Sequence, residues 1–240
     1  MISKNEIKYI QSLYHKKTRD KENVFIVEGQ KMVTELFQSN FGIKKVYATE
    51  KYVVPEWYSS AVTMISDIEL GKMSRLETPN QVLAVVEKKQ QQQRIDTEQI
   101  ILALDGIQDP GNLGTIIRIA DWFGIQQIVA SQDSADCYNP KTVQATMGSI
   151  FRVDVQYLDL NNFLSQSKTK ILGALLNGNN VLQHSSISKG ILVIGNESKG
   201  IRENIKPYIN EAVSIPAFGK AESLNAAVAT GIILSHLIKK

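Results

Sequence analysis

Three separated segments of the sequence carry polar side chains in loops that contain glycine or proline, and each loop directly follows a short apolar run. In the first, DGIQDPGNLGTIIR, Asn112 and Arg118 come after a Pro110-Gly111 turn. An arginine in such a loop is a permanent cation that can stabilise negative charge developing on an oxygen atom. A purely structural interpretation is also open, in which Asn112 caps a helix and Arg118 pairs with Asp121.

The second loop, IGNESKG, contains Gly195, Asn196, Glu197 and Gly200. A glycine at the end of a strand lets a flat ligand approach the backbone, and the adjacent peptide groups can then hydrogen-bond an adenine ring. The alternative is an ordinary turn between a strand and a helix, with Glu197 stabilised by the helix macrodipole. The sequence lacks the GxGxxG spacing of dinucleotide-binding folds, which disfavours a nicotinamide dehydrogenase.

The third loop, SIPAFGKAESLN, begins where a strand stops at Pro216 and leads through Ser223, Leu224 and Asn225 into a long apolar helix. A structural interpretation makes Ser223 the helix N-cap, with small residues after it that permit close packing. The helix expected at 223–238 is apolar nearly all round, so it must be buried on more than one side. A second subunit would provide that burial.

The elements that position these loops follow from the pattern of apolar residues. After residue 99, short runs rich in Ile, Val and Leu predict strands at 100–104, 127–130, 152–156, 170–176, 191–194 and 212–215. Helical patterns lie between most of them, at 112–123, 140–147, 160–166 and 203–209. This alternation predicts an α/β fold with a parallel sheet covered on both faces, whose ligands bind at the carboxyl ends of the strands.

A polar run at 88–98, KKQQQQRIDTE, interrupts the apolar pattern and predicts two domains, with boundaries at 1–88 and 99–240 and a linker at 89–98. The first domain is expected to be small and α/β. Its strands are expected at 24–27, 45–48, 62–65 and 82–86, and its helices at 4–15, 30–38, 55–60 and 66–73.

Positive charge is concentrated at the front of the chain. The net charge is only +3, yet residues 1–21 hold Lys4, Lys8, Lys16, Lys17, Arg19 and Lys21 against only Glu6 and Asp20. Affinity for a polyanion is therefore expected in this segment, with RNA contacts at Lys16, Lys17, Arg19 and Lys21. A solvated helix face is the alternative.

Metal, disulfide and membrane signals are weak. Cys137 is the single cysteine, and the three histidines lack metal-ligand spacing, so we expect no disulfide and no bound metal. The N-terminus does not read as a signal peptide, and the apolar stretch at 223–238 is too short and too polar for a membrane span. A soluble, cytoplasmic protein is expected.

Taken in order, D-P-G-N-L-G-x-x-x-R, I-G-N-E-x-x-G and S-I-P-x-x-G-x-x-x-S-L-N resemble the three sequence motifs of the SpoU (TrmH) family of RNA 2′-O-methyltransferases. KTRDKENVFIVEG at 17–29 resembles the start of the small RNA-binding domain, related to ribosomal proteins, that many members carry. The resemblance implies the SPOUT fold, in which the C-terminal segment is threaded through a loop to form a deep trefoil knot, a rare exception among folds. It also implies a homodimer, and it favours ribosomal RNA over transfer RNA.

The resemblance further implies which residues form the site. S-adenosylmethionine would be bound by Leu175, Leu176, Asn177, Gly195, Asn196, Glu197, Gly200, Ile215, Pro216 and Leu224. The catalytic positions of the family correspond to Asn112, Arg118, Glu197, Ser223 and Asn225.

In the family Arg118 would be the group closest to the ribose hydroxyl and is proposed as a base. A guanidinium normally cannot accept a proton, so stabilising the alkoxide and clamping a phosphate is the easier role. Glu197 would fix the loop or pair with Arg118, while the other catalytic positions would orient Arg118 and the ribose. Two alternatives remain: a SPOUT enzyme that methylates a base, and an RNA-binding assembly factor that retains the fold without catalysis.

Overall fold

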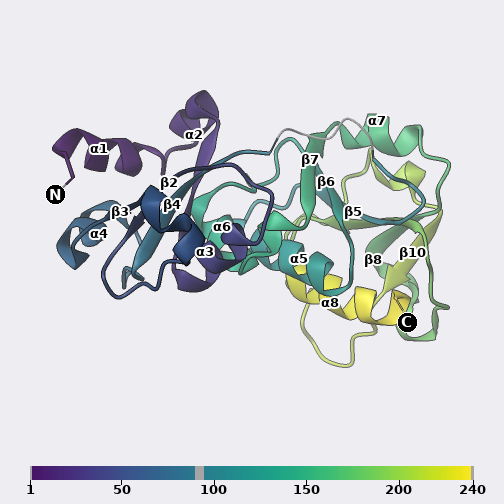
Figure 1. Cartoon of the computed structure of the whole chain (residues 1–240). Helices are drawn as coiled ribbons and strands as arrows, with labels where there is room; N and C mark the ends of the chain where they lie inside the picture. The colour runs from purple at the N-terminus through teal and green to yellow at the C-terminus, as the bar shows by residue number, and fades with distance from the viewer. Residues whose placement is uncertain (1, 90–94, 239–240) are drawn as a thin grey trace. The chain divides into compact units, whose positions relative to one another are not determined.

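The computed structural model describes residues 2–89 and 95–238, which form two compact units (Figure 1). One unit comprises Met1–Gln90 and Tyr138–Phe151, and the other comprises Gln91–Cys137 and Arg152–Lys240. The sequence pattern placed residues 138–151 in the second domain, whereas their contacts are in the first unit. The ring of Tyr138, for example, lies 4.6 Å from that of Phe25, measured between centroids.

The first unit is built on a four-stranded sheet with the strand order β1-β4-β2-β3. Strands β1 and β2 pair antiparallel with β4, and β2 pairs parallel with β3. The strands span Val24–Glu28 (β1), Ile43–Ala48 (β2), Val62–Met64 (β3) and Val82–Glu87 (β4). The helices span Lys4–Ser12 (α1), Lys16–Glu22 (α2), Gln30–Phe37 (α3), Asp67–Met73 (α4) and Pro140–Thr146 (α6), with 3₁₀ turns at Glu56–Ala61 (η1) and Ser149–Phe151 (η2).

The helix expected at 4–15 stops three residues early, and a separate helix, α2, follows it. Arg19 explains the break. Its side chain is 1% exposed, and its guanidinium donates hydrogen bonds to the carbonyl oxygens of Leu13 (3.1 Å) and Tyr14 (2.9 Å). These carbonyls lie just past the end of α1, so Arg19 satisfies groups that the helix leaves unpaired. The expectation that Arg19 contacts RNA is therefore wrong, because its charge is used inside the fold.

The second unit contains a fully parallel six-stranded sheet with the strand order β10-β8-β9-β5-β6-β7, which confirms the expected sheet. Its central strands are buried on both faces, as continuous apolar runs require. The strands span Ile100–Asp105 (β5), Gln127–Ser131 (β6), Asp154–Leu158 (β7), Ile171–Asn180 (β8), Gly190–Gly195 (β9) and Glu211–Ser214 (β10).

The second unit contains three α-helices and two 3₁₀ turns among its described residues. The helices span Pro110–Trp122 (α5), Leu160–Ser165 (α7) and Ala226–Leu237 (α8), with 3₁₀ turns at Val181–Gln183 (η3) and Lys206–Tyr208 (η4). A helix was expected at 203–209, but this segment forms only the 3₁₀ turn η4. Pro207 has no backbone N–H, so it cannot make the hydrogen bond that a helix beginning at 203 needs in its first turn. Helices α5 and α8 pack against each other, as the neighbouring teal and yellow ribbons in Figure 1 show. Within 2–89 and 95–238, no helix is long and apolar enough to cross a membrane.

Candidate active site

The first two polar loops leave the sheet side by side. Strands β5 and β9 are parallel neighbours, and their last residues, Asp105 and Gly195, lie opposite each other in the register. Asn196 then donates a hydrogen bond of 2.8 Å from Nδ2 to the carbonyl oxygen of Gly106. The loops after β5 and β9 are thus joined at the carboxyl edge of the sheet, where ligands bind in this class of fold.

Asn112 joins all three loops through its side-chain amide. Its Nδ2 donates to Oε1 of Glu197 at 2.7 Å, and its Oδ1 accepts from Nδ2 of Asn225 at 2.9 Å. The partners lie 85 and 113 residues further along the chain. Three of the five expected catalytic residues therefore form one hydrogen-bonded chain, which we call the amide relay.

The direction of the amide relay is fixed by the cap of helix α8. Oδ1 of Asn225 accepts from the backbone N–H groups of Ala227 (2.9 Å) and Val228 (3.3 Å), so Nδ2 must face Asn112. An amide oxygen must then meet that donor, which leaves Nδ2 of Asn112 to donate to the Glu197 carboxylate. Asn225, rather than Ser223, is the N-cap of α8.

The cap of helix α5 also differs from the expected one. Asp109 is the N-cap, and its side chain accepts from the backbone N–H of Asn112 at 2.9 Å. The helix therefore begins two residues earlier than the sequence pattern predicts. This shift moves Asn112 inside the first turn and frees its side chain for the amide relay.

Arg118 lies exposed on helix α5, and in the described parts of the chain it has no hydrogen-bond or ion-pair partner. Asp121, its partner in the structural interpretation, instead pairs with Arg152, whose Nη2 lies 2.8 Å from Oδ2. Glu197 is bonded to Asn112 and not to Arg118. The structure therefore leaves the guanidinium of Arg118 available to a ligand.

The loop after β9 is closed tightly on itself. The backbone N–H of Asn196 donates to the carbonyl oxygen of Gly200 at 3.1 Å, and that of Gly200 donates back at 2.8 Å. A Cβ atom built on Gly195 would lie 2.3 Å from the carbonyl carbon of Gly200. Gly195 is thus required by the close approach of two backbone segments, and Gly200 has a φ of +68°, which also favours glycine.

An ion pair between buried Asp105 and exposed Arg202, which the sequence pattern did not single out, holds this loop on β5. Asp105 is 0% exposed, and its carboxylate accepts from the backbone N–H of Arg202 at 2.8 Å and from Nε of Arg202 at 2.5 Å. The hydrogen bond and charge of Asp105 raise the pKa of Arg202. The pKa of Asp133 is lowered, first by a hydrogen bond from Ser131 and then by the charge of Arg202. In the sequence, the one feature that could have indicated this ion pair is Asp105, a carboxylate at the end of the apolar run of β5.

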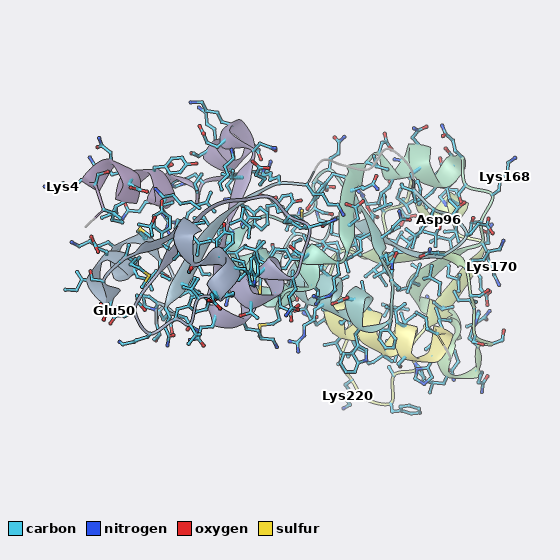
Figure 2. The ribbon with its side chains drawn as sticks, in the orientation of Figure 1. Lys4, Glu50, Asp96, Lys168, Lys170 and Lys220 are labelled. Atoms are coloured by element: carbon cyan, nitrogen blue, oxygen red, sulfur yellow. The ribbon has the colours of Figure 1, made fainter. Side chains whose placement is uncertain are left out.

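Apolar side chains around this edge of the sheet are incompletely covered. Leu176 is 77% exposed and Leu224 is 46% exposed, while Leu175, Ile215 and Pro216 are half-buried. Asn177 and Ser223 are exposed. The loop before α8 projects from the unit and carries Lys220 (Figure 2). Ser223 and Leu224 directly precede Asn225 of the amide relay in the sequence, but no hydrogen bond within the described residues links Ser223 to the relay.

Comparison with protein families gives two matches along the chain. Residues 99–235 match the model of the SpoU rRNA Methylase family, and residues 4–84 match the model of the MRM3-like substrate binding domain. The first match covers most of the second unit, and the second match covers most of the first unit.

Individual relatives are similar along nearly the whole chain. The 23S rRNA (guanosine(2553)-2′-O)-methyltransferase RlmP of Bacillus subtilis is 32% identical, with 98% of this chain and 97% of that protein covered. A TrmH-family protein from Porphyromonas gingivalis has a structure with a TM-score of 0.86 at 32% identity, covering 99% of this chain and 98% of its own. An AdoMet-bound rRNA methyltransferase from Sinorhizobium meliloti has a TM-score of 0.87 at 28% identity, covering 99% and 95%.

Proposed function

This chain belongs to the SpoU rRNA Methylase family, and from that premise we propose that it transfers a methyl group from S-adenosylmethionine to a ribose 2′-hydroxyl of ribosomal RNA. The observation that carries the proposal is the amide relay, which brings Asn112, Glu197 and Asn225 from three separated loops to one edge of the sheet. The relative from Bacillus subtilis, named for methylation of 23S rRNA, is similar over 98% of this chain. We also propose that it acts in the cytoplasm, on the ribosomal RNA that is its proposed substrate.

The residues at this edge of the sheet fit S-adenosylmethionine. Exposed apolar side chains at Leu176 and Leu224 suit the faces of an adenine ring, and the closed loop after β9 offers backbone groups beside them. Bound S-adenosylmethionine supplies the methyl group. We assign its binding to Leu175, Leu176, Asn177, Gly195, Asn196, Glu197, Gly200, Ile215, Pro216 and Leu224.

Arg118 provides positive charge for the ribose oxygen as the hydroxyl proton passes to solvent water. The guanidinium stays protonated, so it acts as a fixed donor to the alkoxide and to a neighbouring RNA phosphate. Its lack of a protein partner in the described residues means that no internal ion pair must break before it binds RNA. Asn112, Asn225 and Ser223 orient the ribose, and Glu197 holds Asn112 in place.

We also assign a knotted chain and a homodimer to this protein. Strand β10 lies at the sheet edge beside β8, yet α8 packs on α5, so the chain crosses back over the sheet after Ser214. The carbonyl oxygen of Leu237 then accepts from the backbone N–H of Ile187, just before β9. Trp122 on α5 is 85% exposed and Val228 on α8 is 51% exposed, an apolar surface that a second subunit would cover.

The experiment is a comparison of ribosomal RNA from a wild-type strain and a strain that lacks the gene. A ribose 2′-O-methyl group blocks alkaline cleavage at that nucleotide, because the 2′-hydroxyl is the group that attacks the phosphate. One alkali-resistant position in the large-subunit RNA should disappear and return when the purified protein and S-adenosylmethionine are added. A lost base methylation would favour a base methyltransferase, and no lost mark in ribosomal or transfer RNA would favour an assembly factor.

A further inference from the structure

A basic hollow lies between helices α1 and α4 of the first unit. Its residues precede those of the amide relay in the sequence. It has a volume of about 480 Å³. Its walls combine cationic and neutral polar side chains with one methionine and contain no carboxylate: Lys8, Gln11, Ser12, His15, Lys72, Met73, Ser74 and Arg75. The cations come from both sides, since Lys8 belongs to α1, Lys72 belongs to α4, and Arg75 follows α4.

The two walls of the hollow are held in a fixed relation. Nε2 of Gln11 donates to the carbonyl oxygen of Lys72 at 2.7 Å, which ties the end of α1 to the end of α4. Helix α4 begins with a capping box between Ser66 and Glu69, and Glu69 also accepts from the backbone N–H of Ile2 at 2.9 Å. The hollow is therefore formed by the fold itself and needs no ordering before it binds a ligand.

The cations of the hollow have no acidic partner in the described residues, unlike several other lysines of the same unit. Lys16 pairs with Asp20 at 2.7 Å, and Lys51 pairs with Asp67 at 2.7 Å. No ion pair is formed by Lys8, Lys72 or Arg75 within residues 2–89 and 95–238, so their charge is directed outward. An external anion would supply the missing partner.

Arg75 is positioned by a ring rather than by a carboxylate. Its guanidinium lies 4.7 Å from the ring centroid of Tyr14, and the hydroxyl of Tyr14 donates to Oε1 of Glu28 at 2.6 Å. The hydroxyl of Ser74 also donates to Glu28, so this buried carboxylate is already satisfied by two donors. The N–H groups of Arg75 remain free for an anion, and their fork matches a phosphate.

We propose that this basic hollow binds the sugar-phosphate backbone of the RNA substrate and thereby fixes the position of the first unit on the RNA. The inference rests on the proposed function for the identity of the ligand. Spaced cations without a carboxylate suit consecutive phosphates, and the exposed side chain of Lys17, two residues after His15, adds positive charge on α2. Phosphate contacts of this kind supply affinity and register without reading the base sequence.

The test uses the full chain and a transcript of large-subunit ribosomal RNA, with binding measured over a range of salt concentrations. The variant Lys8→Ala/Lys72→Ala removes two charges from the hollow, and Lys31→Ala/Lys44→Ala removes two exposed lysines elsewhere on the same unit. We expect the first variant to bind RNA on the order of tenfold more weakly and to lower the salt slope by about 1.4. The control variant should retain the affinity and slope of the wild type.

A third variant, Arg75→Lys, keeps the charge but loses the planar fork, so it should weaken RNA binding while thermal unfolding stays unchanged. Equal losses in the hollow variant and the control, or no loss in either, would overturn the proposal.

Methyl transfer by the wild-type protein to the same transcript separates the two claims. If the wild type transfers methyl groups while Lys8→Ala/Lys72→Ala binds RNA normally, the hollow proposal alone fails. If the wild type transfers none while the hollow variant alone loses RNA binding, the proposed activity fails and the hollow proposal stands.

Discussion

Nδ2 of Asn112 donates a hydrogen bond to Oε1 of Glu197 across 85 positions of the chain, at 2.7 Å. This contact joins the start of helix α5 to the loop after β9, and Asn225 extends it to the start of α8. Because the cap of α8 fixes which way Asn225 points, the polarity of every bond in the amide relay is determined. The effect of a substitution in the amide relay should therefore depend on whether the new side chain can donate or accept a hydrogen bond, and not only on its size.

Replacing Asn112 by aspartate should break the amide relay at Glu197 while preserving its shape. An aspartate at this position can still accept from Asn225, but it cannot donate to Glu197, and two carboxylates then face each other. We expect Asn112→Asp to lower the rate of methyl transfer at least tenfold and the free energy of unfolding by about 1 to 3 kcal/mol. Methyl transfer to RNA and urea unfolding measure these effects.

The control for this prediction reverses the bond. In Asn112→Asp/Glu197→Gln, the new glutamine can donate to the new aspartate, so stability and transfer should recover relative to Asn112→Asp alone. Glu197→Gln by itself keeps an amide oxygen for Asn112 and should have a mild effect. A double variant as impaired as Asn112→Asp would show that Glu197 acts through its charge and not through this hydrogen bond.

Arg118→Ala should strongly reduce the rate of methyl transfer without disturbing the fold. The side chain has no partner in the described residues, so its loss should leave the free energy of unfolding within about 0.5 kcal/mol of the wild type. Loss of a donor to developing negative charge should lower the transfer rate by about 10² to 10³, while calorimetry should show unchanged binding of S-adenosylmethionine. The matched control is Arg152→Ala, which breaks the pair with Asp121 and should retain activity. Wild-type transfer by Arg118→Ala would contradict the assigned role.

Gly195→Ala should prevent binding of S-adenosylmethionine. The added methyl group would lie 2.3 Å from the backbone of Gly200, so the loop after β9 must open. We expect a loss of about 1 to 3 kcal/mol in the free energy of unfolding, with no heat of cofactor binding in calorimetry. Gly219→Ala is the control, because a Cβ atom there meets nothing within 4 Å. Normal cofactor binding by Gly195→Ala would remove this loop from the cofactor site.

The elements that follow from apolar periodicity could be read from the sequence, and those that depend on distant side chains could not. The parallel sheet follows from runs such as IILALD, which are apolar on both faces. The end of α1 does not, because it is set by a side chain of the next helix, Arg19. The starts of α5 and α8 were likewise misplaced by two or three residues, since several polar residues compete for each cap.

For the site, the sequence indicates which residues are polar and lie in loops, but it does not indicate which of them are hydrogen-bonded to each other. Asn112, Glu197 and Asn225 are recognisable as polar residues in loops, yet their connection by one amide depends on strand order in the sheet. Glu197 was expected to fix the loop or to pair with Arg118. Its bond to Asn112 ties the loop after β9 to the start of α5, and it does not pair with Arg118. The pair of Asp105 and Arg202 was missed because nothing in the local pattern of Arg202 indicates a buried partner 97 residues away.

The attachment of helix α1 to the first sheet should weaken in acid. Glu6 accepts hydrogen bonds from Lys45 and from Oη of Tyr47 (2.7 Å), which together lower its pKa below the ordinary 4.5. A lowered folded-state pKa means that this stabilisation is present above pH 4.5 and is lost as the pH falls through the folded value. Urea unfolding should therefore show Glu6→Gln less stable than the wild type at pH 7, with the difference vanishing in acid. A difference that is constant with pH would show that the charge of Glu6 is not involved.

Arg19 and Lys17, two residues apart on α2, should respond in opposite ways to the same substitution. Arg19→Met keeps an apolar stem but leaves the carbonyl oxygens of Leu13 and Tyr14 without their donors, which should cost about 1 to 3 kcal/mol of unfolding free energy. Lys17→Met changes an exposed side chain, so stability should stay within about 0.5 kcal/mol. RNA binding should show the reverse order at a temperature where both variants are folded, because only Lys17 presents its charge to solvent. If Arg19→Met is as stable as the wild type and binds RNA more weakly than Lys17→Met, the guanidinium of Arg19 reaches the RNA and the internal role assigned to it is wrong.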